Sequence, residues 1–382
     1  MRRFLAPVTP IGWVVLATGA AALAAGRGRG WVEAGTAGAV LVVLFVVSLV
    51  FTVGRSAYAV TLELVDARVR IGQRALGRVE VVARGRLLPA RVELPVGARS
   101  TSFALPWMVP GAVHEDTFSI PTTRRGVIRV GPVRSVRGDP WGLLRRRVRW
   151  TDAVDLYVHP EVVALSGTSA GVLRELEGQS TRELSNNDMS FHALRGYVAG
   201  DDRRNIHWKT TARTGRLMVR QYEDTRRTHT ALALATDVED FAGPAEFELA
   251  VSVTASLGVG TIVDGRGLSA WAGGTALRSA SPVLLLDDCS GLTSGDDQPR
   301  APALAALVAR RAPHASVVLL VVGSSASGND LVAAVRVLHG VRTVVVTCAV
   351  GEPIAARTRG AVSFVTLGAL ADLPQALLAA GT

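Results

Sequence analysis

The sequence predicts a membrane protein in three parts: a two-helix transmembrane hairpin, a small antiparallel β-sandwich and an α/β domain built on a parallel sheet. Two long charge-free windows near the N-terminus predict the hairpin. Period-two alternation of apolar and polar residues then predicts strands, and apolar runs that alternate with amphipathic segments predict the parallel sheet. We place these parts at residues 1–56, 57–160 and 228–382, with a connector at 161–227.

Charge distribution defines the hairpin. No charged residue occurs between Arg3 and Arg27 or between Glu33 and Arg55, and each window reaches the ~20 residues that cross a hydrocarbon core of ~30 Å. We expect spans at about residues 8–26 and 34–54. Arginines outside the two spans outnumber those in the loop between them, which predicts a cytoplasmic soluble body. If the first span is instead a cleaved signal peptide, the body still reaches the same compartment.

The composition argues against nucleic-acid binding and against metal or disulfide frameworks. The chain has 382 residues and a net charge of +10, but Lys209 is its single lysine and the arginines are spread along the sequence. A nucleic-acid surface would concentrate them in one basic patch. Cys289 and Cys348 form no C-x-x-C pair, so neither a zinc site nor a disulfide framework is expected. No cofactor is predicted.

Alternating segments predict the strands of the β-sandwich, and Gly and Pro separate them. One strand places Arg145, Arg147 and Arg149 on the same face. This face is either solvated or a binding surface, for example for anionic lipid. The expected strands lie at residues 61–65, 77–84, 90–96, 116–133 and 154–160.

In the α/β domain, Val- and Leu-rich runs predict buried parallel strands, and the segments between them predict helices. The strands are expected at 230–236, 268–272, 283–286, 317–322, 343–348 and 362–367. The helices are expected at 245–262, 301–311, 329–338 and 371–380.

Residues 194–223 carry the densest chemistry in the chain. Asp201 or Asp202 is a suitable helix N-cap and Gly215 a suitable helix end, so we expect a short helix at 201–214 and a strand at 216–222. Paired carboxylates and arginines around an indole suit either a structural network or a ligand site. We expect Asp201 to pair with Arg213 and seat Trp208 against the sheet. The candidate site residues are Arg195, Tyr197, Gly200, Asp201, Arg203, Arg204, Trp208, Lys209, Arg213 and Gly215.

The spacing R-x-Y-x-x-G-D-x-x-R-x-I-x-W-x-x-x-A-R-x-G-x-L-x-V-R in this segment resembles the hallmark of the bacterial domain of unknown function 58 family. The upstream segments RRGVIRVGPV and DPWGL are similar to that family's preceding strand and turn. The resemblance implies a β-sandwich followed by a von Willebrand factor A-like domain. Family members are often encoded beside MoxR-type AAA+ ATPases and transglutaminase-like membrane proteins, and no enzymatic activity is established for them.

The A-like resemblance raises the question of a divalent cation. Metal-binding A domains use D-x-S-x-S after the first strand, because Mg²⁺ prefers hard oxygen donors. Here Asp237 is in place, but Glu239 and Phe241 stand where the serines belong, and VVGSSASG at 321–328 lacks the expected aspartate. We therefore predict no metal, with Asp237, Glu239 and Asp240 as weak candidates.

Two common catalytic signatures are absent from the sequence. Lys209 has no P-loop context, and H-E-x-x-H does not occur. A thiol nucleophile at Cys289 with His314 is less favoured than ordinary packing. We therefore expect a non-catalytic membrane-anchored scaffold or adaptor that docks a partner, with a MoxR-type ATPase the first choice. The alternative is a cell-envelope enzyme or regulator that acts through the Arg195–Arg213 cluster.

Overall fold

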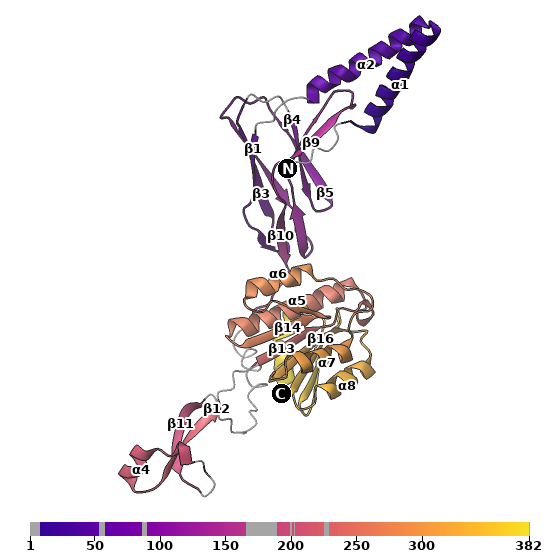
Figure 1. Cartoon of the computed structure of the whole chain (residues 1–382). Coiled ribbons are helices and arrows are strands. Elements are labelled where there is room, and N and C mark those ends of the chain that lie inside the picture. Colours follow the sequence, from indigo (N-terminus) through magenta and orange to yellow (C-terminus); the bar gives the residue numbers. More distant parts are fainter. Residues whose placement is uncertain are drawn as a thin grey trace. The chain divides into compact units, whose positions relative to one another are not determined.

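The computed structural model of the chain is shown in Figure 1. It describes residues 8–52, 58–85, 90–165, 189–198, 201, 203–224 and 229–381. The chain divides into two compact units, Met1–His159 and Pro160–Thr382. The first unit contains two long helices and a β domain, and the second contains a two-stranded arm and an α/β domain.

Two apolar helices, α1 (Pro10–Arg29) and α2 (Val32–Thr52), form the predicted hairpin. Thr9 caps α1, because its side-chain oxygen accepts a hydrogen bond from the Gly12 N–H at 3.0 Å. Glycines allow the two helices to approach closely. A Cβ added to Gly26 would lie 2.6 Å from the Cα of Gly35, and one added to Gly38 would lie 2.6 Å from the backbone nitrogen of Leu23.

Three described helices are long and apolar enough to cross a membrane: α1, α2 and α5 (Pro244–Val263). The buried share of each helix distinguishes α5 from α1 and α2. The apolar window of α5 is 61% buried inside the protein, against 11% for each N-terminal helix. A helix covered by protein on most sides is apolar because it lies in a core, whereas α1 and α2 leave most of their apolar surface exposed, as a membrane-spanning helix would. At ~1.5 Å per residue, α1 is ~30 Å long, which matches a hydrocarbon core.

The β domain consists of two sheets around one core. Its first sheet has the order β1–β3–β6, and its second has the order β2–β10–β7–β4–β8–β9, with β5 paired to β4. All of these pairs are antiparallel except β2–β10. Val79 and Val81 from the first sheet and Leu94 and Leu156 from the second belong to the same buried cluster. The strands are β1 (Tyr58–Leu64), β2 (Arg68–Arg70), β3 (Ala75–Ala83), β4 (Ala90–Val96), β5 (Arg99–Leu105), β6 (Val113–Ile120), β7 (Gly126–Val130), β8 (Arg134–Gly138), β9 (Arg145–Arg149) and β10 (Val154–His159).

Strand β9 presents its alternate arginines outward, as the sequence predicts. Glu93 forms an ion pair with Arg145 at 2.8 Å, and its carboxylate lies 4.0 Å from the guanidinium of Arg147. Arg149 forms an ion pair with Asp152 at 2.6 Å. These contacts give the face a structural explanation within the β domain.

The α/β domain is a seven-stranded sheet with the order β15–β14–β13–β16–β17–β19–β18. Its five central strands are parallel, and the two edge strands are antiparallel to their neighbours. The strands are β13 (His229–Leu234), β14 (Gly267–Ala272), β15 (Thr275–Leu277), β16 (Val317–Gly323), β17 (Arg342–Cys348), β18 (Ala355–Arg359) and β19 (Val362–Leu367).

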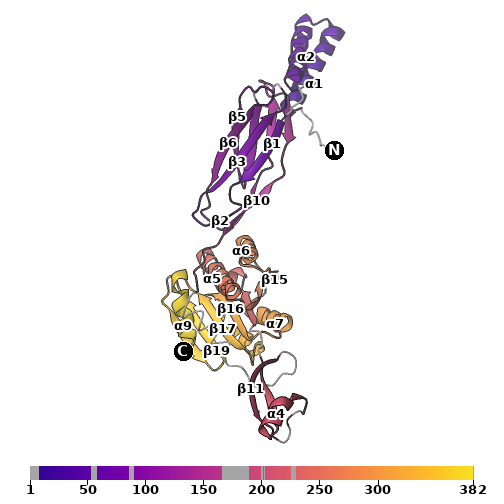
Figure 2. The same ribbon diagram turned by 90° about the vertical axis from the view of Figure 1, so that its left-hand side faces the viewer.

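Helices cover both faces of this sheet, as Figure 2 shows. Residues of α5, α6 (Pro282–Gly291) and α9 (Leu373–Gly381) pack with Leu232 and Leu319 on one face. Residues of α7 (Ala301–Arg311) and α8 (Gly328–Val337) pack with Ala233 and Leu320 on the other. Successive residues of a strand point to opposite faces, so one apolar run supplies both cores.

The predicted strand at 283–286 is wrong, because these residues lie in α6. Ser281 caps this helix and accepts a hydrogen bond from the Leu284 N–H at 3.4 Å, and Pro282 occupies the first turn. Ser followed by Pro is a helix-start signal, but a short apolar run by itself suits a strand equally well.

Candidate functional site

The predicted site segment forms a small two-stranded arm, here called the hallmark arm (residues 189–224). Strands β11 (Met189–Gly196) and β12 (Met218–Asp224) pair antiparallel. Between them lie a short 3-10 turn at Arg203–Asn205 and the helix α4 (Trp208–Thr214). Ile206 bridges to Val219, and the exposed fractions of these two residues are 7% and 4%. The described part of the arm thus has only a minimal apolar core, and Figure 1 shows its two strands and helix.

The helix of the arm begins later than predicted. His207, not Asp201, is the N-cap of α4, and its Nδ1 lies 3.3 Å from the Thr210 nitrogen. Gly215 ends the helix in the left-handed region at φ 69°, as its position predicts. In place of the single helix expected at 201–214, the described residues form a 3-10 turn at Arg203–Asn205 and then the helix α4. Asp202 and Gly200 lie outside the described residues.

Asp201 pairs with Arg195 rather than with Arg213, so the predicted Asp201–Arg213 pair is wrong. The Arg195 guanidinium donates from Nη1 to Oδ2 at 2.8 Å and from Nη2 to Oδ1 at 2.7 Å. The Val198 N–H donates to the same carboxylate at 2.9 Å. Hydrogen bonds from Arg195, then from Val198, lower the pKa of Asp201. The bidentate pair therefore fixes the turn that follows β11.

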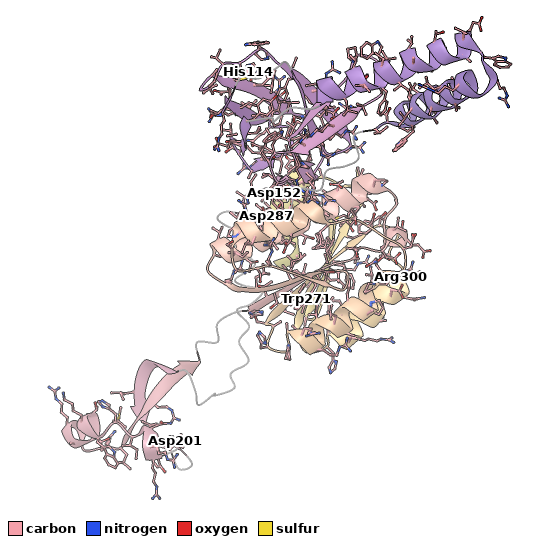
Figure 3. All side chains as sticks on the ribbon, turned by 45° about the horizontal axis from the view of Figure 1, so that its top comes forward. His114, Asp152, Asp201, Trp271, Asp287 and Arg300 are labelled. Atoms are coloured by element: carbon pink, nitrogen blue, oxygen red, sulfur yellow. The ribbon has the colours of Figure 1, made fainter. Side chains whose placement is uncertain are left out.

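The remaining candidate residues lie on the surface of the arm. Trp208 is 66% exposed, so the expectation that it packs against the sheet is wrong. The structure leaves Arg203, Arg204, Lys209 and Arg213 exposed as well, and α4 buries none of its residues. Tyr197 is half-buried, and its N–H donates to the Leu217 carbonyl at 2.9 Å. The described arm presents an indole and several cations to its surroundings; Figure 3 labels Asp201 within it.

The weak metal candidates lie after β13, at the carboxyl edge of the parallel sheet. Most of their known contacts are within the protein, but the buried Oδ2 of Asp240 has no hydrogen-bond partner in the described part of the chain. Asp237 is 5% exposed, and its two oxygens accept hydrogen bonds from the backbone N–H groups of Glu239 and Gln298, each at 3.0 Å. Glu239 forms an ion pair with Arg300, and Asp240 lies 3.9 Å from the same guanidinium. Burial raises the pKa of Asp240, and Arg300 opposes this shift.

Arg300, labelled in Figure 3, supplies positive charge beside Glu239 and Asp240. A cation bound by these carboxylates would have to compete with this guanidinium. Phe241, in place of a serine ligand, packs edge-to-face on Phe247 at 5.2 Å. Within the described ranges, no group of three His, Cys, Asp or Glu residues is arranged to hold a metal ion.

Sequence reasoning missed the importance of Asp139, in the turn between β8 and β9. Its carboxylate accepts hydrogen bonds from the N–H groups of Trp141 (2.9 Å), Leu143 (3.2 Å) and Leu144 (2.5 Å). Burial of Asp139 acts to raise its pKa, but the backbone hydrogen bonds lower it overall. An Asp-Pro-Trp-Gly turn that ends in two leucines was the available signal, because a surface turn rarely carries such an apolar pair.

The comparisons with known proteins support the family resemblance over part of the chain. Residues 193–284 match the model of the family described as Protein of unknown function DUF58. The match begins in the hallmark arm and extends into α6. No curated protein matches the chain at a significant level.

Solved structures resemble only a part of the chain, and weakly. The CARDB domain of a Pyrococcus furiosus protein, solved with di-metal ions, is 14% identical with a TM-score of 0.20, covering 28% of this chain and 97% of that one. The C-terminal domain of wzt is 12% identical with a TM-score of 0.23, covering 29% and 78%. A β-glucosidase from Listeria innocua with glucose is 12% identical with a TM-score of 0.18, covering 28% and 17%.

Proposed function

We propose that this chain is a non-catalytic scaffold, held in the membrane by α1 and α2, whose hallmark arm docks a partner protein. The exposure of the arm carries the proposal. Trp208 is 66% exposed on a helix without buried residues. Tryptophan and arginine are the residue types that most often dominate binding at protein interfaces. A conformation fixed by the Arg195–Asp201 pair also lowers the entropic cost of docking.

The charge of the arm indicates the chemistry of the partner. Arg203, Arg204, Lys209 and Arg213 surround the indole in sequence, and all are exposed. A partner with an acidic surface complements them, and such complementarity raises the association rate and the specificity. The family resemblance makes a MoxR-type AAA+ ATPase the first partner to test and a transglutaminase-like membrane protein the second. Both fit a soluble body on the cytoplasmic side, which the arginine distribution around the hairpin favours.

The fold is consistent with this reading. Two sheets around one core support the β-sandwich interpretation of the β domain. A parallel sheet with helices on both faces supports the von Willebrand factor A-like interpretation of the second domain. In that interpretation, Arg300 replaces the cation of metal-binding A domains, so docking would proceed without a metal.

The alternative function, an enzyme or regulator that acts through the Arg195–Arg213 cluster, has less support. Arg195 is engaged by Asp201, and Arg213 lies exposed on α4. Reacting groups usually converge in a cleft that excludes water. The exposed surface of the arm suits macromolecular recognition better.

Affinity capture of the full-length chain from host membranes, with quantitative mass spectrometry, tests the proposal. The test variant is Lys209→Glu with Arg213→Glu on α4. The matched control is Arg310→Glu with Arg311→Glu, an equal charge change at exposed positions on α7. We expect one protein to be recovered in stoichiometric amounts with wild type and the control, and to be lost with the arm variant at unchanged melting temperature. Equal recovery with both variants would contradict docking by the arm.

A further inference from the structure

The end of the β domain beside the hairpin has an unusual surface. Strand register defines this end: Tyr58 pairs with Ala83, Ala90 pairs with Leu105 and Gly138 pairs with Arg145. Two loops project from it, the β5–β6 loop (residues 106–111) and the β8–β9 turn (residues 139–144). We call these two loops the hairpin-side rim. The N–H of Gly111 donates to the Ala83 carbonyl at 2.8 Å, which holds the first loop at this end.

The β8–β9 turn reaches beside the two helices. Its Leu143 and Leu144 are 3% and 1% exposed, and they form one cluster with Phe45 of α2. Val15 and Leu16 of α1 and Leu44 of α2 pack against the same cluster. Leu44 and Phe45 precede Thr52, the end of α2, by two helical turns, which is about 11 Å at ~1.5 Å per residue. The turn therefore lies at the depth of the membrane-spanning helices and not beyond their ends.

Two links hold the rim at this depth. The Thr9 N–H donates to the Leu143 carbonyl at 3.0 Å, and its hydroxyl donates to the Gly142 carbonyl at 2.8 Å. Val8, just before the hairpin, forms an antiparallel bridge with Leu144. The start of the hairpin is thus joined to the rim.

The outward side chains of the rim are large and apolar. Trp107 is 62% exposed, Val109 is 57% exposed and Trp141 is 46% exposed. Met108, between the first two, is 3% exposed and packs into the core of the β domain. The buried methionine fixes the loop so that both of its neighbours remain on the surface. Prolines at 106 and 110 further restrict this conformation.

We propose that the hairpin-side rim inserts into the interfacial region of the bilayer, with Trp107, Val109 and Trp141 in contact with lipid. The inference rests on the proposed membrane anchoring and adds a second, peripheral contact to it. Tryptophan concentrates at the membrane–water boundary because its ring is apolar and its N–H is polar. Lipid is the occupant that the geometry favours, since the turn packs beside α1 and α2, whose outer surfaces face the acyl chains.

Site-directed fluorescence with the full-length chain tests this contact. Single cysteines replace Val109, Trp141, Val65 or Val43 in turn and carry an environment-sensitive fluorophore. Val65 is the matched control, an exposed valine (69%) just after β1, at the opposite end of the domain. Val43 is exposed on α2 and reports the hairpin itself. The native Cys289 and Cys348 are buried, and labelled wild type gives their background. The vesicles contain equal parts of phosphatidylcholine and phosphatidylglycerol, with some phosphatidylcholine carrying a nitroxide quencher near the headgroup or deeper in the acyl chain.

We expect Val43→Cys to be quenched by the deep nitroxide. Val109→Cys and Trp141→Cys should be quenched several times more strongly than Val65→Cys by the shallow nitroxide. The lipid contact would be overturned if Val43→Cys were quenched but both rim positions were as weakly quenched as Val65→Cys. The anchoring would then remain intact, and the rim would face water or a protein. An unquenched Val43 would overturn the anchoring and, with it, this inference.

Discussion

Thr9 donates its backbone N–H to the carbonyl oxygen of Leu143 at 3.0 Å, and so joins the start of α1 to the β8–β9 turn. The same threonine caps the helix through the Gly12 N–H. Asp139 orders the other partner, because its carboxylate holds the turn that presents the Leu143 carbonyl. The two-helix hairpin and the β domain are therefore coupled by a fixed contact as well as by the chain.

Gly12 tests this coupling, because a Cβ at this position would lie 2.2 Å from the Leu143 carbonyl oxygen. We expect Gly12→Ala to displace the turn and to destabilise the β domain by ~1–3 kcal/mol, as overpacking usually does. Denaturant unfolding in detergent measures the loss. Gly28→Ala is the matched control on the same helix, since nothing lies within 4 Å of a Cβ there. Equal stability of the two variants would show that the contact is dispensable.

Asp201→Asn tests the role of the bidentate pair. Without the negative charge, the Arg195 guanidinium and the Val198 N–H lose a strong acceptor. We expect faster hydrogen exchange at the Val198 amide and an unchanged melting temperature for the α/β domain. Asp66→Asn, at an exposed aspartate of the β domain, is the control and should leave exchange at Val198 unchanged. A large drop in the melting temperature would instead indicate that the arm is part of the folding core.

The residue types of the hallmark arm could be predicted from sequence, but their partners could not. Several arginines lie close to Asp201 in sequence, and the choice of Arg195 depends on the turn at Tyr197–Val198. The exposure of Trp208 could not be predicted either, because a tryptophan at the start of a short helix can be buried or exposed, depending on the tertiary structure. The Thr9–Leu143 contact joins residues 134 positions apart, and no local pattern encodes such a pair.

The broad architecture could be predicted from the sequence more fully than the contacts of the arm. Charge-free windows identify α1 and α2, and the alternation of strand and helix assigns α5 to the α/β domain even though α5 is as apolar as α1. The edge strands β15 and β18 were not expected, because they are short or exposed and lack an apolar run. A short apolar run suits a strand or a helix equally well, and this explains the wrong strand prediction at α6. There, only the Ser281–Pro282 start signal indicates a helix.

Added Mg²⁺ should leave the melting temperature of the full-length chain unchanged. Both oxygens of Asp237 accept backbone hydrogen bonds, and Glu239 is paired with Arg300. A true site would add ~2.7 kcal/mol at a hundredfold excess over its dissociation constant. Calorimetry with and without millimolar Mg²⁺ or Mn²⁺ checks this expectation. A saturable rise that Asp237→Ala abolishes would show that this edge does bind a cation.

Arg300→Met should make stability fall more steeply as the pH rises. Burial already raises the pKa of Asp240, and Arg300 is the group that opposes the shift. Without the guanidinium, the folded-state pKa rises further above the unfolded value of ~3.9. Asp240 then holds its proton more strongly in the folded than in the unfolded protein. The resulting loss of stability is absent below the unfolded pKa and grows as the pH rises through the folded pKa. Melting temperatures across pH measure the effect, and Arg310→Met on α7 is the exposed control.

His229 should give the α/β domain the opposite dependence on pH. Its ring lies 4.4 Å from that of His314, and its Nε2 lies 2.8 Å from the Ser269 hydroxyl. Burial, and then the His314 charge, lower the pKa of His229. The unfolded chain therefore binds the proton more readily, with a pKa of ~6.5. The stability that neutral His229 contributes is complete above the unfolded pKa and falls as the pH drops toward the folded pKa.

His229→Gln should flatten the dependence of stability on pH, whereas His339→Gln, on the surface, should preserve it. Unfolding of the full-length chain at a series of pH values measures both slopes, and an unchanged slope in His229→Gln would exclude this histidine as the cause.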